Sequence, residues 1–246
     1  MRLQEGLIMD MSAGSARVLP DCQGEVGNME VIAFNGSPRK DWNTATLLQH
    51  ALQGAASQGA DTKLIHLYDY NYKGCVSCFR CKLKNGDSYG ECAANDDLRP
   101  LLGEAAECSA ILVGSPIYFG SITGMTKSFL ERLMFPYLVY DSDHSSLFRR
   151  KMSTGFIYTM GANQSRMQSS GYQQDFQFME GVLRRIFGAS ESLFVTDTYQ
   201  FEDYAKYQTS AFDVAGKKKR RQEIFPKDCK LAFEMGARLA LQSDSK

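Results

Sequence analysis

Short apolar runs alternate with amphipathic segments from residue 30 onward. The apolar runs predict strands at 31–34, 63–67, 110–113, 154–158 and 192–196. Between and after them, apolar residues recur three or four positions apart and predict helices near 47–55, 98–105, 125–138, 172–187 and 226–242. Strands that alternate with helices in this way predict an α/β domain, with a parallel sheet covered by helices on both faces.

The first 28 residues carry Gly, Ser, Asp and Asn without such sustained periodicity. We therefore expect residues 1–28 to form a flexible or loosely docked extension and residues 29–246 to form the folded domain. The alternative is an ordered N-terminal arm that packs on a partner subunit.

Charge and hydropathy narrow the class of protein. The 28 Lys and Arg residues balance 28 Asp and Glu residues, whereas a nucleic-acid-binding protein normally carries a basic excess. No apolar run approaches the roughly 20 residues that a membrane helix needs, and the first 30 residues lack the pattern of a signal peptide. We expect a cytoplasmic protein that contacts neither nucleic acid nor membrane.

The segment NGSPRKDWNT at 35–44 joins the first predicted strand to the first helix. Loop amides, hydroxyl groups, the charged fork of Arg39 and the positive end of a helix together favour an anion. The chain has neither the G-x-x-x-x-G-K-[ST] loop of nucleoside triphosphatases nor a G-x-G-x-x-G dinucleotide motif. A monophosphate ligand fits better, although the same polar residues could act only as turn and cap residues.

A second loop, GSPIYFGSITG at 114–124, follows the third predicted strand. Its aromatic residues stand between glycines at the end of a strand, where ligands bind in open α/β sheets. Such residues can form a wall for a flat heterocycle. The alternative is a buried aromatic cluster, which would leave the polar first loop unexplained.

The segments NGSPRKDWNTATLL and GSPIYFGSITGMTKSFLER resemble the flavodoxin-like NADPH-dependent FMN reductase family, including its iron–sulfur flavoprotein branch. The resemblance covers most of residues 30–200. It implies a flavodoxin-like three-layer sandwich with a five-stranded parallel sheet in the order 2-1-3-4-5. It also implies a homodimer or homotetramer.

The same resemblance implies a set of FMN-binding residues. Those implied to hold the phosphate are Ser37, Arg39, Asn43 and Thr44. Those implied to surround the isoalloxazine ring are Pro116, Ile117, Tyr118, Phe119 and Gly120. The loop after the fourth strand, with Thr159 and Gly161, matches the third flavin-contacting segment of the family more weakly.

Four of the seven cysteines fall within 18 residues: Cys75, Cys78, Cys81 and Cys92. The spacing C-x2-C-x2-C is more typical of iron–sulfur ligation than of zinc, which usually draws on two separated pairs. The segment resembles the cysteine motif of iron–sulfur flavoproteins, but its last gap of ten residues is longer than is general there. A 4Fe-4S cluster, free or redox-active thiols, and zinc therefore all stay open. A cluster here is expected near the flavin or across a subunit interface.

Three further sequence features are weaker signals. His66 lies among apolar strand residues and is expected to be a satisfied core or rim residue rather than a base. The basic run at 217–221 is expected to be a solvated segment before the last helix. The Tyr-rich stretch at 199–212 is long enough to cover the flavin or to form an interface arm.

The resemblance implies an FMN-dependent oxidoreductase. NAD(P)H, or ferredoxin if a cluster is present, would be the electron donor, and the acceptor a small molecule such as a quinone, a flavin, or a nitro or azo compound. No acid–base pair is expected because the flavin carries the bond chemistry. The alternatives are a non-catalytic electron carrier, which the zero net charge disfavours, and a cysteine-based redox sensor.

Overall fold

The computed structural model describes residues 29–242, in which six strands form the sheet. Five strands are parallel: β1 (Glu30–Asn35), β2 (Asp61–His66), β3 (Ala110–Tyr118), β5 (Met152–Thr159) and β6 (Gly188–Val195). Their order, β2-β1-β3-β5-β6, confirms the predicted order of the five predicted strands. The two-residue strand β4 (Ser121–Ile122), which was not predicted, pairs antiparallel with the end of β3.

Seven α-helices lie in the described part of the chain. They are α1 (Asn43–Ala56), α2 (Leu98–Glu107), α3 (Gly124–Met134), α4 (Gln164–Ser169), α5 (Tyr172–Phe187), α6 (Val214–Glu223) and α7 (Phe225–Gln242). The five predicted helices are confirmed, whereas α4 and α6 were not predicted. The third predicted helix ends early, at Met134, and a 3-10 turn that contains Pro136 follows it, because proline cannot donate the next helical hydrogen bond.

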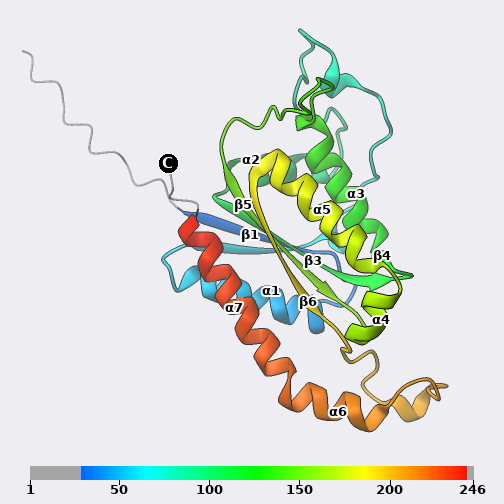
Figure 1. The fold of residues 1–246 in the computed structure, drawn as a ribbon. Helices are drawn as coiled ribbons and strands as arrows, with labels where there is room; N and C mark the ends of the chain where they lie inside the picture. Colours follow the sequence, from blue (N-terminus) through cyan, green and yellow to red (C-terminus); the bar gives the residue numbers. More distant parts are fainter. Residues whose placement is uncertain (1–28, 243–246) are drawn as a thin grey trace, which may run out of the picture.

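Alternating side chains along each strand divide the core into two halves. On β1, Val31 and Ala33 pack with α1 and α7, whereas Ile32 and Phe34 pack with α2, α3 and α5. Figure 1 shows these two helical layers on opposite sides of the sheet. A parallel sheet buried on both faces explains why its strands read as nearly continuous apolar runs.

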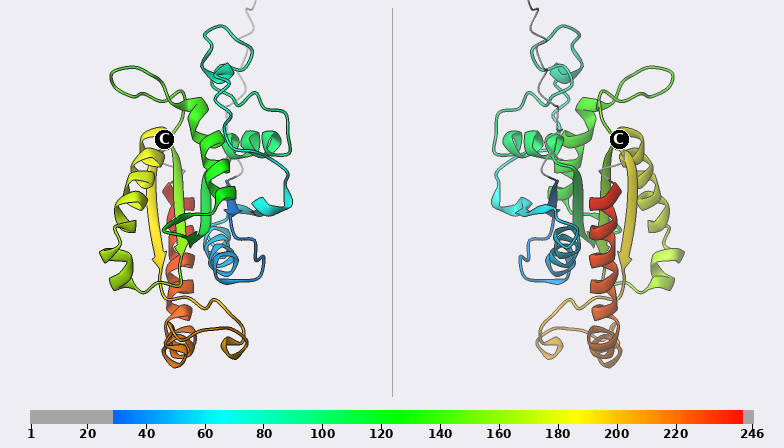
Figure 2. Two further views of the ribbon diagram at one scale, coloured as in Figure 1. Left: turned by 90° about the vertical axis from the view of Figure 1, so that its right-hand side faces the viewer. Right: turned by 90° about the vertical axis from the view of Figure 1, so that its left-hand side faces the viewer.

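The two ends of the sheet carry different segments. The cysteine-bearing segment projects from one end of the molecule, and α6 lies at the opposite end (Figures 1 and 2). The predicted extension at 1–28 lies outside the described residues. Within 29–242, no helix has both the length and the apolar character needed to cross a membrane.

The basic run at 217–221 forms the centre of α6, so the expectation of a solvated segment before the last helix holds for Lys218 and Lys219 but not for Lys217. Lys217 is only 4 % exposed, whereas Lys218 and Lys219 are exposed. Helical periodicity places the first of these side chains on the inner face and the next two outside. Because residues 217–221 are all Lys or Arg, a hydropathy profile does not show which side of this helix is buried.

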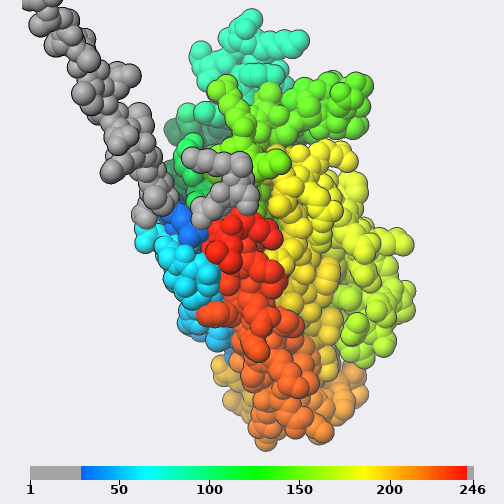
Figure 3. Space-filling model, turned by 60° about the vertical axis from the view of Figure 1, so that its left-hand side comes forward, coloured from blue at the N-terminus to red at the C-terminus, as the bar shows by residue number. Residues whose placement is uncertain are grey.

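Helices α1 and α7 pack in close backbone contact, and their surfaces meet along their length in Figure 3. A Cβ atom on Gly236 would lie 1.7 Å from the carbonyl oxygen of Ala51, and one on Gly54 would lie 1.9 Å from that of Phe233. Glycine at both positions is therefore required by the close approach of the two helices, which cover one face of the sheet.

We predict that Gly236→Ala lowers the free energy of unfolding by about 1–3 kcal/mol, because the methyl group must push the two backbones apart. The matched control is Gly103→Ala in α2, where an added Cβ meets nothing within 4 Å. That change is expected to raise stability by about 0.5–1 kcal/mol. Urea unfolding of the cofactor-free protein measures both, and equal effects of the two substitutions would contradict the packing argument.

Candidate functional site

The first loop is ordered by Asn35, the last residue of β1. Its Oδ1 accepts a hydrogen bond from the backbone N–H of Ser37 at 3.0 Å, and its Nδ2 lies 2.9 Å from Nδ1 of His66. Ser37 Oγ in turn accepts from the backbone N–H of Arg39 at 3.1 Å. His66 is thus a partner of Asn35 at the rim of the sheet, as the sequence predicted.

Helix α1 begins beside this loop without a side-chain cap. Its N-cap residue is Trp42, which makes no capping hydrogen bond. The first amides of a helix need an acceptor from outside the helix. Because Ser37 and Thr44 are buried at this helix end, the position combines backbone and hydroxyl donors with the positive end of the helix dipole.

These groups line a cavity of about 140 Å³ at the carboxyl ends of β1, β3 and β5. Nine of the eleven predicted FMN-binding residues line it: Ser37, Arg39, Asn43, Thr44, Pro116, Ile117, Tyr118, Thr159 and Gly161. The fold therefore brings together three segments that are far apart in the sequence. Their role toward a flavin stays a prediction.

The other two, Phe119 and Gly120, lie outside the cavity lining. They form the turn between β3 and β4, with φ values of 51° and 83°, and the side chain of Phe119 is fully exposed. Strand β3 continues to Tyr118, five residues beyond its predicted end. Pro116 to Tyr118 are thus held by a strand rather than by a free loop.

The end of β5, which forms one wall of the cavity, is connected directly to helix α1. Thr159 Oγ1, at the end of β5, lies 2.8 Å from Thr44 Oγ1, and both side chains are buried. This hydroxyl pair fixes the distance between α1 and the loop that follows β5.

Five further residues line the cavity without having been predicted individually: Trp42, Met160, Thr198, Tyr199 and Gln200. The last three follow β6, and Tyr199 and Gln200 bind the first loop through their carbonyl groups. Arg39 donates to the Gln200 carbonyl at 2.6 Å, and Trp42 Nε1 and Asn43 Nδ2 donate to the Tyr199 carbonyl. Backbone carbonyls leave no sequence motif, so only the Tyr-rich stretch at 199–212 pointed to this wall.

The four clustered cysteines line a second cavity, of about 310 Å³. Cys78 is exposed, Cys75 and Cys92 are half-buried, and burial raises the pKa of the buried Cys81 thiol. Among residues 29–242, no three His, Cys, Asp or Glu side chains are arranged as a group that could hold a single metal ion. The thiols are instead distributed around the cavity wall.

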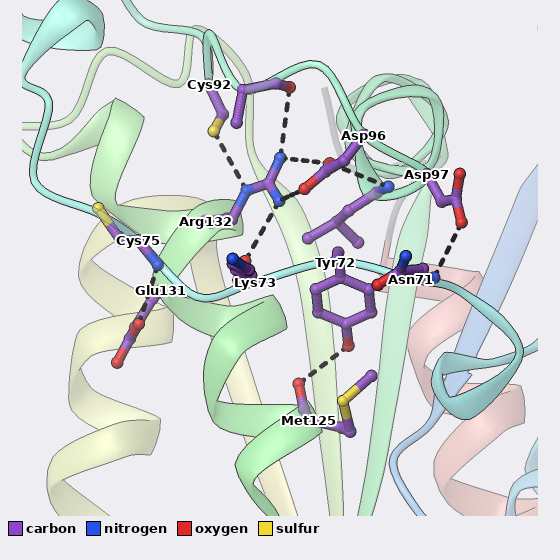
Figure 4. A network of polar contacts seen from close by, with 12 residues as sticks. Asn71, Tyr72, Lys73, Cys75, Cys92, Asp96, Asp97, Met125, Glu131 and Arg132 are labelled. Atoms are coloured by element: carbon purple, nitrogen blue, oxygen red, sulfur yellow. Dashed lines mark hydrogen bonds and ion pairs between the residues drawn. The ribbon is translucent and has the colours of Figure 1, made fainter.

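Arg132 on α3 connects both ends of the cysteine segment (Figure 4). Its Nε donates to Cys92 Sγ at 3.3 Å, and its NH1 group donates to the Lys73 carbonyl at 3.3 Å. It also forms a bidentate ion pair with Asp96, at 2.5 and 2.9 Å. Only 2 % of the Arg132 side chain is exposed, and these contacts bring Cys92 to the wall that carries the other three thiols.

Neighbouring polar contacts hold the segment against α3. Glu131 accepts from the backbone N–H of Cys75 at 3.2 Å. Lys82 donates to the carbonyls of Phe135, Pro136 and Leu138 just after α3, and burial lowers its pKa. A cation at a helix C-terminus satisfies carbonyls that lack helical partners.

The two cavities lie near opposite ends of α3. Tyr118 and β4 precede its first residue, and Arg132 and Phe135 line the cysteine cavity at its end. Eleven residues at 1.5 Å each give the helix a length of about 16 Å. Within one chain, the cysteine segment therefore does not lie beside the first cavity, although it follows a strand of the same sheet.

Comparison with known proteins assigns the chain to a family. The model of the NADPH-dependent FMN reductase family matches residues 29–189. The chain belongs to this family. Its curated relatives place it in the iron–sulfur flavoprotein branch, and the family makes it a flavin-dependent oxidoreductase.

Two relatives illustrate the extent of the match. An iron–sulfur flavoprotein of Methanocaldococcus jannaschii is 31 % identical over 150 residues, which cover 61 % of this chain and 71 % of the relative. One of Archaeoglobus fulgidus is 38 % identical over 104 residues, or 42 % of this chain and 48 % of the relative. The second alignment thus spans about half of either protein.

Solved structures confirm the flavodoxin-like fold. An NAD(P)H:quinone oxidoreductase from Methanothermobacter marburgensis superposes with a TM-score of 0.63 at 12 % identity, covering 86 % of this chain and 99 % of the other. An azoreductase from Bacillus anthracis gives 0.60 at 10 % identity, covering 85 % and 99 %. At these identities the likeness concerns the fold alone.

The Arg132–Asp96 pair generates a prediction about stability. Burial opposes the ionisation of Asp96, but the guanidinium of Arg132 and the backbone N–H of Leu98 outweigh it and lower its pKa. Because the folded pKa lies below the unfolded value, the stabilisation is present above about pH 4 and is lost as the pH falls through the folded pKa.

We predict that Asp96→Asn lowers the free energy of unfolding at pH 7 by about 2–3 kcal/mol, because it leaves a buried guanidinium unpaired. Asp97→Asn is the control, since Asp97 only accepts from the backbone N–H of Asn71 at the surface. Urea unfolding between pH 7 and pH 3 should converge for the wild type and Asp96→Asn. A difference that is independent of pH would contradict the ion-pair explanation.

Proposed function

We propose that this chain binds FMN in the cavity at the ends of β1, β3 and β5 and transfers electrons from NAD(P)H to a small electrophile such as a quinone. The observation that carries the proposal is the uncapped N-terminus of α1, which faces the same cavity as buried Ser37 and Thr44. Backbone amides and hydroxyls at a helix N-terminus suit a phosphomonoester.

The size of the cavity supports a binding mode in which the cavity holds only the phosphate end of FMN. About 140 Å³ is small beside the ~300–1,000 Å³ typical of ligand pockets. It suits the phosphate end, which Ser37, Arg39, Asn43 and Thr44 would hold. The ring would lie against Pro116, Ile117 and Tyr118, with the turn at Phe119 and Gly120 at its edge and Thr159 and Gly161 on the opposite wall.

The exposed aromatic residues beside this cavity support a homo-oligomer. Tyr118 is 48 % exposed, and Phe119 is fully exposed. A ring that lies against Tyr118 would therefore have one open side in a single chain. A second subunit would complete the site in a homodimer or homotetramer.

Bound FMN would supply the hydride and electron transfer, so the protein has to bind and orient it rather than provide an acid–base pair. The Tyr118 phenol is neutral at physiological pH at its ordinary pKa, and burial raises that pKa further. The strand geometry at Ile117 and Tyr118 fixes the backbone groups that would contact the edge of the ring. Backbone donors of this kind stabilise negative charge without a titrating residue.

We also propose that Cys75, Cys78, Cys81 and Cys92 hold a 4Fe-4S cluster. The four thiols share one cavity without converging on a single point. A single zinc ion needs four ligands about 2.3 Å away, whereas a cluster distributes its ligands over several irons. Arg132 would place a positive charge beside the thiolate of Cys92, and a ferredoxin would then act as the one-electron donor.

The first test is steady-state NAD(P)H oxidation with a quinone by the FMN-loaded protein. An enzyme of this class is expected to turn over at about 1 per second or faster. An electron carrier or a thiol-based sensor should be at least about a hundredfold slower. Failure of the purified protein to take up FMN would exclude the flavin proposal itself.

The cluster generates a separate prediction for Cys92→Ser. Anaerobically purified wild type is expected to contain about four irons and four acid-labile sulfides per chain. Cys92→Ser should lose most of both but keep its FMN, because the two cavities lie near opposite ends of α3. Cys22→Ser, which changes a cysteine outside the cluster, is the control. Iron-free wild type would exclude the cluster, and full iron in Cys92→Ser would exclude Cys92 as the fourth ligand.

A further inference from the structure

Helix α6 lies beyond residue 189, where the match to the family model ends. It nevertheless contacts three of the four segments that line the first cavity, those that follow β1, β5 and β6. Of its five consecutive cations, Lys217 is buried, Arg220 and Arg221 are half-buried, and Lys218 and Lys219 are exposed. The helix therefore has a function in the site that its composition did not indicate.

Lys217 connects the loop after β5 with the loop after β6. Its Nζ forms an ion pair with Asp197 at 2.6 Å and donates to the carbonyls of Gly161 at 3.0 Å and Thr198 at 3.3 Å. Gly161 and Thr198 both line the cavity. A buried ammonium with three acceptors fixes the relative position of the two loops.

Arg221, one helical turn further on, reaches the third segment. It donates to Asn43 Oδ1 at 2.9 Å, and Asn43 Nδ2 donates to the Tyr199 carbonyl at 2.7 Å. The amide of Asn43 is thus oriented from both ends at the start of α1. The guanidinium also stacks on the ring of Phe225 at 4.0 Å, which limits its freedom.

The charge of Arg221 lacks a counter-ion in the described part of the chain. Lys217 pairs with Asp197 and Arg220 with Asp228, but no carboxylate of residues 29–242 lies at ion-pair distance from Arg221. Burial lowers the pKa of Arg221 from its ordinary value. A partly desolvated cation without a partner favours an anion nearby.

We propose that α6 acts as a clamp on the phosphate end of the flavin site, in which Arg221 is a positioning residue that orients Asn43 and adds a second positive charge to that of Arg39 near the phosphate. Lys217 holds the neighbouring loops after β5 and β6 in place. The inference rests on the proposed FMN function and extends it to a helix outside the matched family segment. The ligand feature it concerns is the phosphomonoester, not the ring.

The test compares the dissociation constants of FMN and riboflavin, which lacks the phosphate, by fluorescence titration. Arg221→Gln is expected to weaken FMN about tenfold, the order expected for a charge several ångströms away. It should change riboflavin binding less than twofold. Lys219→Gln, which removes an exposed charge from the same helix, is the matched control and should change neither constant more than twofold.

Two further measurements separate charge from structure. Arg221→Lys should recover part of the preference for FMN over riboflavin, and added salt should weaken FMN binding more in the wild type than in Arg221→Gln. Lys217→Gln should weaken both ligands, because it releases two walls of the cavity, and circular dichroism establishes that the variant is folded.

The outcomes distinguish the clamp from the function on which it rests. Wild type that binds neither ligand would refute the FMN proposal. Wild type that binds FMN, with an unchanged preference in Arg221→Gln or an equal loss of both ligands, would overturn the clamp and leave the FMN proposal intact.

Discussion

The parallel pairing of β1, β3 and β5 is the constraint on which both candidate sites depend. It brings the carboxyl ends of three strands to one edge of the sheet, so residues 35–44, 114–120 and 159–161 become neighbours. The register places Pro116 opposite Thr159, and the hydroxyl contact between Thr44 and Thr159 connects α1 to the same edge. At this edge, hydroxyl groups, the uncapped start of α1 and aromatic side chains therefore surround one small cavity.

The same topology determines where the cysteine segment lies. After β2 the chain runs along α3, where Tyr72 donates to the carbonyl of Met125 and Glu131 accepts from the N–H of Cys75. The thiols consequently gather near the far end of the helix, about 16 Å from its start.

Buried cations organise both ends of the molecule by the same physical means. Arg132 and Lys217 are each nearly inaccessible, and each donates to a carboxylate and to backbone carbonyls of segments distant in sequence. A buried cation that is fully hydrogen-bonded tolerates little displacement, because each lost partner leaves a desolvated charge. Loops without secondary structure of their own can therefore be held in defined positions.

In the described part of the chain, the sequence by itself determined five of the six strands, their order through the family resemblance, five of the seven helices, and nine cavity-lining residues. Local patterns sufficed for these because periodicity and loop composition report on burial and on the ends of strands. They also indicated a cysteine site but could not place it, since the path along α3 depends on contacts such as Tyr72 with Met125.

Only the tertiary structure decided the contribution of α6, the wall formed by Tyr199 and Gln200, and the exclusion of Phe119 and Gly120 from the cavity. These features depend on backbone carbonyls, on which side of a charged helix turns inward, and on the continuation of β3 to Tyr118. None of them has a local signature, because a carbonyl is the same in every residue and a lysine reads as polar wherever its partner lies.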